Sequence, residues 1–304
     1  MTFNEALEAF TMEQRLRGNT EKTIRGYQGF ISQFITYLER CSITKVTALT
    51  LQHVQKYQLY ISSRRCTNKS QQLTRRTVRT YMRNIRIFIA FLYDEGFVVE
   101  PIHQRLKLPK AEKPTIEILT DEETDRLQRV FGDELLCKRN RAMVYLMLDS
   151  GLRLSEVAGL RVSNINFDDG YIMVTGKGRK GRIVPIGRKA SEALKMYIKV
   201  RPAGGGSNLF LSIRGTPITP GGVLQMIKRL KHESSIPRLH AHLLRHTFAT
   251  NFILHGFGDV YQLSRILGHS EIRITEGYVQ LASYYAILQN RNRQTYLDKK
   301  SSGN

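Results

Sequence analysis

Hydrophobic and polar positions along the first 95 residues follow the period of an α-helix. After Thr20, a suitable N-cap, apolar side chains recur three and four residues apart. They are Ile24, Tyr27, Ile31, Phe34, Ile35 and Leu38. The same periodicity predicts two further helices, over residues 49–62 and 74–93. The first part of the chain is therefore expected to be helical.

A change of pattern between residues 100 and 114 predicts a linker, because three prolines and several charges interrupt the periodicity there. Beyond it, Thr120 and Glu123 form a capping box that predicts the start of a helix. Residues 165–186 alternate β-branched side chains around glycine-rich turns, which predicts a short antiparallel sheet with its last two strands joined at Gly176–Gly181. From Ser191 onward the pattern is mostly helical.

These patterns predict a mainly α-helical protein with a small antiparallel β-sheet in its second domain. We place a helical domain at residues 1–100, a linker at 101–117, a second domain at 118–297 and a flexible tail at 298–304. A chain of 304 residues with 41% hydrophobic content is long enough and apolar enough for two domains, each with its own core.

The charge narrows the choice of partners. The chain has 47 Lys and Arg against 26 Asp and Glu, a net charge of +21, and chains this basic usually bind nucleic acid. A membrane surface is the weaker alternative, because no apolar run approaches the ~20 residues that a spanning helix needs. The first ten residues mix acidic and apolar side chains, unlike a signal peptide, so we expect a cytoplasmic protein.

The three cysteines, Cys41, Cys66 and Cys137, are scattered and form no C-x-x-C pair. This suits a reducing compartment and favours neither a disulfide framework nor a zinc site.

Basic residues cluster in the third predicted helix, opposite an apolar face that contains Val78, Met82 and Ile85. From Arg40 to Tyr93 the chain has eleven Lys or Arg and no Asp or Glu. Solvated helix faces usually mix signs, so we favour phosphate contact over a plain exposed face. The expected DNA contacts are Arg75, Arg76, Arg79, Arg83 and Arg86, with Arg179, Lys180 and Arg182 in and after the later glycine-rich turn. Both halves of the chain are basic: 18 basic and 8 acidic residues lie in positions 1–110, and 29 and 18 follow.

Six residues of the second domain could together carry chemistry, although each alone has an ordinary structural explanation. They are Arg153, Lys177, His242, Arg245, His269 and Tyr278. Residues 176–181 are not a P-loop, which needs Ser or Thr after its Gly-Lys and a helix. A metal cluster of His240, His242, His246 and His269 has no supporting carboxylate or thiolate pattern, and a two-metal nuclease would need clustered acids. We therefore expect neither a metal nor another cofactor.

The six residues suit an attack by a hydroxyl group on a phosphodiester. Fixed arginines can stabilise the charge that gathers on the non-bridging oxygens, and a lysine on a turn can protonate the leaving oxygen. A tyrosine hydroxyl, with a pKa of about 10, needs a base or a positive field to become a nucleophile. A covalent phosphotyrosine would keep the bond energy for rejoining.

In order and spacing, this set resembles the signature of the tyrosine recombinase (phage integrase) family, and Xer-type members look most similar. The intervals are 24 residues from Arg153 to Lys177, 65 to His242, 3 to Arg245, 24 to His269 and 9 to Tyr278. The phrases SGLRLSEVAGL, GKGRKGRIVPIG, HLLRHTFAT and LGHS fit as well, and the helix after Thr20 looks like the family's core-binding domain.

The resemblance implies a C-shaped clamp of two domains, a helical SAM-like core-binding domain and a catalytic domain, around DNA. Tyr278 would attack a phosphate to give a 3′-phosphotyrosyl bond, and Arg153, Arg245 and His269 would bind that phosphate. Lys177 would be the general acid, and His242 would assist proton transfer. Glu156 matches the family's supporting acidic position, although a solvent-facing helix acid is an equally good interpretation.

The implied partners are double-stranded DNA with paired inverted core sites and a homotetramer on two duplexes that exchanges C-terminal helices. A second recombinase or an accessory protein is a further expected partner. For the tail we favour docking on a neighbouring subunit through residues 283–297.

Two positions depart from the Xer pattern. Glu276 and Gly277 replace a Thr-rich, apolar approach to the tyrosine, and Gly277 weakens a helix by up to ~1 kcal/mol, so this segment is expected to need a partner to position it. Ala241 replaces a common proline, which leaves the start of that helix less fixed.

We therefore expect a site-specific recombinase that serves integration, excision or dimer resolution. The alternatives are a type IB topoisomerase-like enzyme and a catalytically silent DNA-binding or accessory protein.

Overall fold

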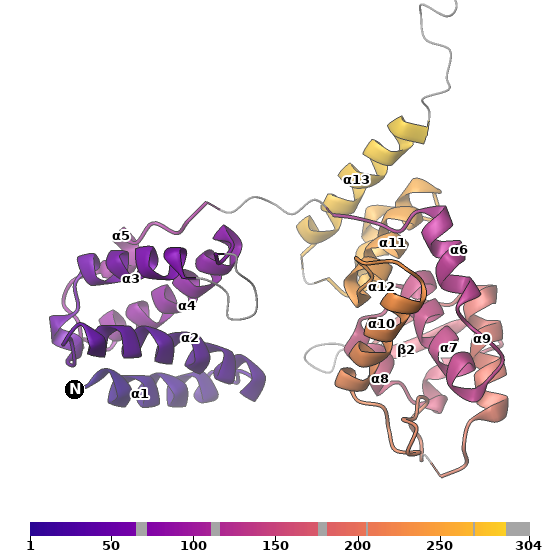
Figure 1. Ribbon diagram of the computed structural model, residues 1–304, viewed down its shortest axis with the longest axis horizontal. Helices are drawn as coiled ribbons and strands as arrows, with labels where there is room; N and C mark the ends of the chain where they lie inside the picture. Colours follow the sequence, from indigo (N-terminus) through magenta and orange to yellow (C-terminus); the bar gives the residue numbers. More distant parts are fainter. Residues whose placement is uncertain (65–71, 111–115, 176–180, 205, 270, 290–304) are drawn as a thin grey trace, which may run out of the picture. The chain divides into compact units, whose positions relative to one another are not determined.

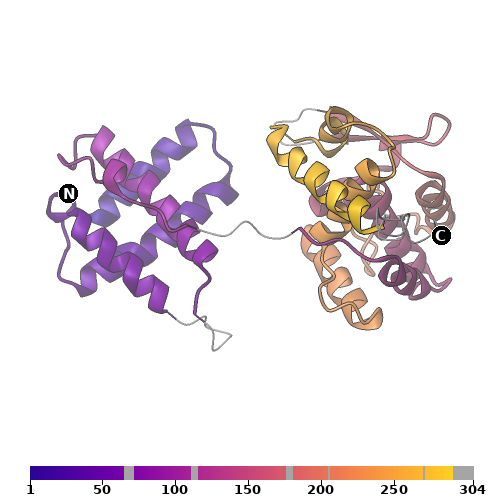
Figure 2. The ribbon, with the colours of Figure 1, turned by 90° about the horizontal axis from the view of Figure 1, so that it is seen from above.

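The structure is a computed structural model that describes residues 1–64, 72–110, 116–175, 181–204, 206–269 and 271–289. The chain divides into two compact units, Met1–Pro114 and Thr115–Asn304. Both are built mostly from helices, and the second also contains a small sheet (Figures 1 and 2). The predicted fold class, mainly helical with a small antiparallel sheet, is confirmed.

The helices of the first unit begin where the sequence offers threonine caps. The hydroxyl oxygens of Thr2, Thr20, Thr50 and Thr74 each accept a hydrogen bond from the backbone N–H three residues later, which satisfies a free donor of the first turn. The helices are α1 (Phe3–Leu16), α2 (Glu21–Arg40), α3 (Leu51–Ser63), α4 (Arg75–Asp94) and α5 (Ile102–Arg105), with a 3₁₀ turn at Val46–Ala48.

The core of the first unit is aromatic and aliphatic. The Phe10 ring makes edge-on contacts with Tyr27, Phe88 and Phe91 at centroid distances of 5.4–5.6 Å. The predicted apolar face of α4 is buried in this core, whereas Tyr27 is only half-buried.

The first unit extends beyond its predicted end at residue 100. Ile102 and Leu106, four residues apart around α5, are buried in its core. The part of the expected linker that begins at residue 101 is thus packed and partly helical, and the division between the units falls at Pro114.

The second unit surrounds an apolar core with helices and a three-stranded antiparallel sheet in the order β1-β2-β3. The strands are β1 (Ile165–Asn166), β2 (Tyr171–Thr175) and β3 (Gly181–Pro185), and Ile172 on β2 pairs with Val184 on β3. The helices are α6 (Asp121–Arg129), α7 (Leu135–Ser150), α8 (Leu154–Gly159), α9 (Arg188–Val200), α10 (Pro220–Glu233), α11 (Ala241–Leu254), α12 (Val260–Leu267) and α13 (Arg273–Gln289), with a 3₁₀ turn at Val162–Asn164.

Helices α11, α12 and α13 pack together at one side of the second unit (Figure 1). Their contact buries a small cluster that contains Ala249, Phe252, Leu263, Leu267 and Tyr278. Glu276 and Gly277 lie inside α13, so the glycine does not interrupt the helix. Among the described helices, none has the length and apolar character to cross a membrane.

Candidate active site

Two glycines end helices at the site and leave backbone carbonyls there without a helical partner. Gly151 ends α7 and Gly268 ends α12, both in the left-handed conformation, with φ of 61° and 63°. The last carbonyls of a helix have no partner within it. Those near Gly151 and Gly268 are therefore free to accept hydrogen bonds from arginines elsewhere in the second unit.

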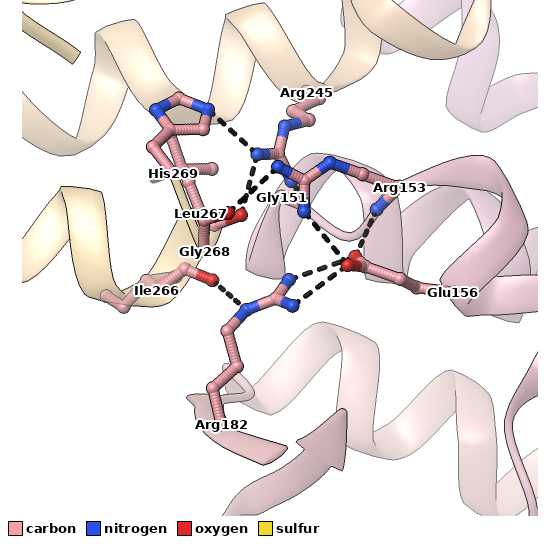
Figure 3. A network of polar contacts seen from close by, with 9 residues as sticks. All are labelled: Gly151, Arg153, Glu156, Arg182, Arg245, Ile266, Leu267, Gly268 and His269. Atoms are coloured by element: carbon pink, nitrogen blue, oxygen red, sulfur yellow. Dashed lines mark hydrogen bonds and ion pairs between the residues drawn. The ribbon is translucent and has the colours of Figure 1, made fainter. Parts of the chain in front are cut away.

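Arg245, on α11, donates to two of these carbonyls and to His269, and it is almost fully buried. Its Nη1 donates to the Gly151 carbonyl at 2.5 Å, and its Nη2 donates to the Leu267 carbonyl at 2.8 Å and to Nε2 of His269 at 3.0 Å (Figure 3). Burial, with Arg153 nearby, lowers the pKa of Arg245 to about 10, so the group stays charged at neutral pH. Arginine has five N–H donors, so two remain for a ligand.

Arg153 forms the N-cap of α8 and is more exposed than Arg245. Its Nη1 donates to Oε1 of Glu156 at 3.0 Å, and its Nη2 donates to the Gly268 carbonyl at 3.1 Å. Gly268 thus links this arginine to the loop that contains His269, as Figure 3 shows. The two arginines lie on different elements, and both donate to carbonyls at the end of α12.

Glu156 connects Arg153 to a third arginine. Arg182, on β3, donates from Nη1 and Nη2 to the two carboxylate oxygens at 2.8 and 2.9 Å, and from Nε to the Ile266 carbonyl at 2.6 Å. The Glu156 side chain is only 6% exposed. Burial alone would raise its pKa, but hydrogen bonds from Arg182 and Arg153 hold the pKa below the ordinary value. Glu156 is therefore a buried carboxylate, and the solvent-facing interpretation is wrong.

His269 follows Gly268 and is held by both ring nitrogens. Its Nε2 accepts from Arg245, which can only donate, so the ring proton lies on Nδ1 and is donated to Oγ1 of Thr275 at 2.9 Å. Burial and the charge of Arg245 lower the pKa of His269 to about 4, so the ring is neutral at pH 7. Thr275, fully buried, thereby links the loop to α13.

Tyr278 lies one turn further along α13 and is 4% exposed. Its ring stacks on His269 at a centroid distance of 6.4 Å, and its hydroxyl lies 2.8 Å from Nδ1 of His246. Burial raises the pKa of the Tyr278 hydroxyl, and the charges of Arg245 and Arg153 oppose that rise. The phenol is thus protonated at neutral pH and lies within the field of the arginines.

The structure brings most of the predicted site residues together. Arg153, Arg245, His269 and Tyr278 form one cluster with Glu156, and His242 lies on α11 one turn before His246, the two rings 6.1 Å apart. Burial and Arg245 lower the pKa of His242. The helix begins at Ala241 without a side-chain cap.

The residues predicted to contact DNA fall into three groups by their position in the structure. The α4 arginines, at 75, 76, 79, 83 and 86, are exposed, and Arg79 donates to the Pro109 carbonyl at 2.7 Å. Arg182 instead forms an ion pair with Glu156 inside the site, and its side chain is only 13% exposed. Lys177, Arg179 and Lys180 lie outside the described residues.

Two residues of the cluster were not predicted. His246 was considered only as part of a metal cluster, and Thr275 was not singled out. The spacing of His242 and His246, four apart on one helix, was a signal, but the partner of His246 lies 32 residues further along the chain.

Comparison with known families identifies the class of protein. The model of the phage integrase family matches residues 117–284, and that of the phage integrase SAM-like domain matches residues 2–104. The chain belongs to the phage integrase family. The predicted Xer-like resemblance and enzyme class, a tyrosine-type site-specific recombinase, are thereby confirmed.

Individual relatives agree with this assignment. The chain is 30% identical to tyrosine recombinase XerC of Halalkalibacterium halodurans, over 90% of this chain and 92% of the relative. It is 31% identical to tyrosine recombinase XerD of the same organism, over 92% and 94%.

Solved structures show the same fold. The Tn1549 transposon integrase in complex with circular intermediate DNA matches with a TM-score of 0.71 and 21% identity, covering 100% of this chain and 99% of that one. A lambda integrase dimer bound to a core site matches with a TM-score of 0.71 and 17% identity, covering 90% and 97%.

Proposed function

We propose that this site-specific recombinase cleaves and rejoins DNA with Tyr278 as its nucleophile. The observation that carries the proposal is the position of the phenol: it stacks on His269, which in turn accepts a hydrogen bond from Arg245. A tyrosine in an ordinary core would not lie against two neutral histidines and within the field of two arginines. DNA is the substrate, in keeping with the net charge of +21 and with the DNA-bound integrases of the same fold.

In the proposed reaction the scissile phosphate binds to the donors that remain on Arg153 and Arg245. Charge that develops on its non-bridging oxygens is stabilised by these fixed cations, which need no reorganisation during the step. Tyr278 Oη forms a bond to phosphorus while the bond from phosphorus to the 5′ oxygen breaks. Lys177 supplies a proton to that oxygen, leaving a 3′-phosphotyrosine and a 5′-hydroxyl.

Glu156 and Arg182 support this arrangement without touching the phosphate. The carboxylate holds Arg153 at the start of α8, and Arg182 ties the same carboxylate to the end of α12. In the first unit, the exposed α4 arginines would contact DNA phosphates. In the second unit, Arg179 and Lys180 would do so. Closure of the two units around DNA as a clamp is a further part of the prediction.

Assembly belongs to the proposal as well. We expect four subunits on two duplexes with inverted core sites, joined through residues 283–297 of each tail. Helix α13 continues past Tyr278 to Gln289, and its Tyr284 is an exposed aromatic residue. Such a residue is suited to pack against another chain.

The proposal is tested with a duplex selected from a random pool by its binding to the full-length protein, then nicked near each candidate scissile phosphate. The nick lets the cleaved fragment diffuse away, so a covalent complex accumulates. Wild-type protein should give an adduct that resists denaturation in EDTA, and Tyr278→Phe should bind the duplex equally well without forming one. An adduct with Tyr278→Phe would overturn the assignment of the nucleophile.

A further inference from the structure

The hydroxyl of Tyr278 has one hydrogen-bond partner among the described residues, and that partner is a histidine outside the predicted set. Nδ1 of His246 lies 2.8 Å from Tyr278 Oη, and the two ring centroids are 5.6 Å apart. His246 is on α11 directly after Arg245, so one helix turn contributes both the phosphate-binding guanidinium and the partner of the nucleophile.

We infer that His246 is a catalytic residue that orients the Tyr278 hydroxyl and accepts its proton during attack on DNA. This inference rests on the proposed function and deepens it, because it assigns the proton that Tyr278 must lose. This role is separate from that of His242, which lies one turn earlier on α11. His242 is expected to assist proton transfer, whereas His246 accepts the proton of Tyr278 itself.

Elimination among the neighbouring groups favours His246. Arg153 and Arg245 are donors only and cannot take a proton. Both nitrogens of His269 are occupied, by Arg245 and by Thr275. In the part of the chain that the structure describes, His246 is therefore the group in contact with the phenol that has a nitrogen able to accept.

The charge state of His246 agrees with this role. Burial lowers its pKa to about 4, with further lowering by His242, His240 and Arg245, so the ring is neutral at pH 7. A neutral ring that accepts at Nδ1 has its proton on Nε2. A bound phosphodiester adds a negative charge beside the arginines, which favours the imidazolium that forms when the proton arrives.

The proton balance closes in both directions. As Tyr278 Oη bonds to phosphorus, its proton moves to Nδ1 of His246, and the departing 5′ oxygen receives a proton from the general acid. In rejoining, the 5′-hydroxyl attacks the phosphotyrosine, its proton returns to the general acid, and the imidazolium of His246 returns its proton to the leaving phenolate. Side chains of this protein thus account for both proton transfers.

The test compares single-turnover cleavage by full-length wild type, His246→Ala, His246→Asn and Lys177→Ala, with His255→Ala, at the C-cap of the same helix, as a control. Each protein cleaves the nicked, selected duplex with either oxygen or sulfur as the 5′-bridging atom. A thiolate leaves without protonation, so sulfur removes the need for a general acid but not for a base. Gel shift with the intact duplex checks that each variant folds and binds.

We expect His246→Ala to cleave about 100-fold more slowly than wild type on both substrates, the size of a general-base contribution. Sulfur should restore Lys177→Ala toward the wild-type rate and leave His246→Ala slow. Asn keeps an acceptor near the Nδ1 position without its basicity, so the rate of His246→Asn should rise about tenfold per pH unit between pH 7 and 9, as hydroxide replaces the base.

Wild-type rates in His246→Ala or His246→Asn would overturn the inference, as would rescue of His246→Ala by sulfur, which would place the residue on the leaving group. Failure of wild type to form any adduct with either substrate would instead overturn the proposed function itself. The two failures are therefore distinguishable in one experiment.

Discussion

Glu156 is the residue on which the charge balance of the site depends. It is the carboxylate that neutralises part of a cluster of three guanidinium groups, and it receives hydrogen bonds from Arg153 and from Arg182. Both the acid and Arg182 are largely buried, with side chains 6% and 13% exposed. A buried charge that loses its partner is strongly destabilising, whereas an exposed one is not.

Glu156→Gln should therefore lower the free energy of unfolding by about 3 kcal/mol, because Arg182 keeps its charge and loses its anion. Cleavage should also slow, since Arg153 loses the group that orients it. Urea denaturation and the adduct assay measure the two effects. The matched control is Glu192→Gln, whose partner Arg188 is 3.9 Å away with side chains 58% and 88% exposed, and which should change stability by less than about 0.5 kcal/mol. Equal losses for the two variants would contradict the account.

At the scale of elements, the ends of helices matter more to the site than their interiors. Helix α7 ends at Gly151 with φ of 61°, and the carbonyl there accepts from Arg245. A Cβ at this position would lie 2.4 Å from Cδ1 of Phe248 and 2.9 Å from Cδ2 of Leu267. Glycine is thus required both by the backbone conformation and by the close approach of α11 and α12.

Gly151→Ala should cost about 3 kcal/mol of stability, of which the left-handed backbone accounts for about 1 and the clash for the rest. Gly256 separates the two contributions, since its φ is 68° but an added Cβ would meet nothing within 4 Å. Gly256→Ala should cost only about 1 kcal/mol. Chemical denaturation of the two variants measures the difference, and equal costs would show that the contact with Phe248 is unimportant.

A further prediction concerns the exposed face of α4. Arg83→Ala with Arg86→Ala should weaken DNA binding and reduce the slope of log affinity against log salt by about 2, because each phosphate contact contributes about 0.9. Removing two charges from exposed positions of α9, Arg188→Ala with Lys199→Ala, should leave the slope nearly unchanged. Fluorescence anisotropy across a salt series gives both values, and equal slopes for the two variants would argue against DNA contact by α4.

Much of this local structure could be predicted from the sequence. The caps at Thr20 and Thr120, and the apolar face of α4, depend on residues a few positions apart, and all are present. Contacts across the chain could not be predicted in the same way. Arg182 pairs with Glu156 over 26 residues, and His246 meets Tyr278 over 32, so periodicity gives no sign of either.

For the molecule as a whole, the neutral histidines predict loss of stability in acid. The pKa values of His246 and His269 are about 4 in the folded protein, below their ordinary value of 6.5. Between pH 4 and 6.5 the unfolded chain therefore binds more protons, so the free energy of unfolding should rise with pH through this window and level off above it. Urea midpoints at several pH values measure the slope.

Two variants test whether these histidines cause the acid sensitivity. His246→Asn combined with His269→Asn should flatten part of the slope, whereas His255→Ala, at an exposed position, should keep the wild-type slope. A slope unchanged in the double variant would mean that other groups cause the acid sensitivity.

Identification of the residue that carries DNA in the trapped adduct tests directly whether Tyr278 is the nucleophile. The adduct formed by wild type is digested with protease, and the peptide that retains nucleotide is sequenced by mass spectrometry. We expect a single site, Tyr278, linked through a 3′-phosphate, with a free 5′-hydroxyl on the released strand. A nucleotide on any of the other tyrosines, on a serine or through a 5′-phosphate would contradict it.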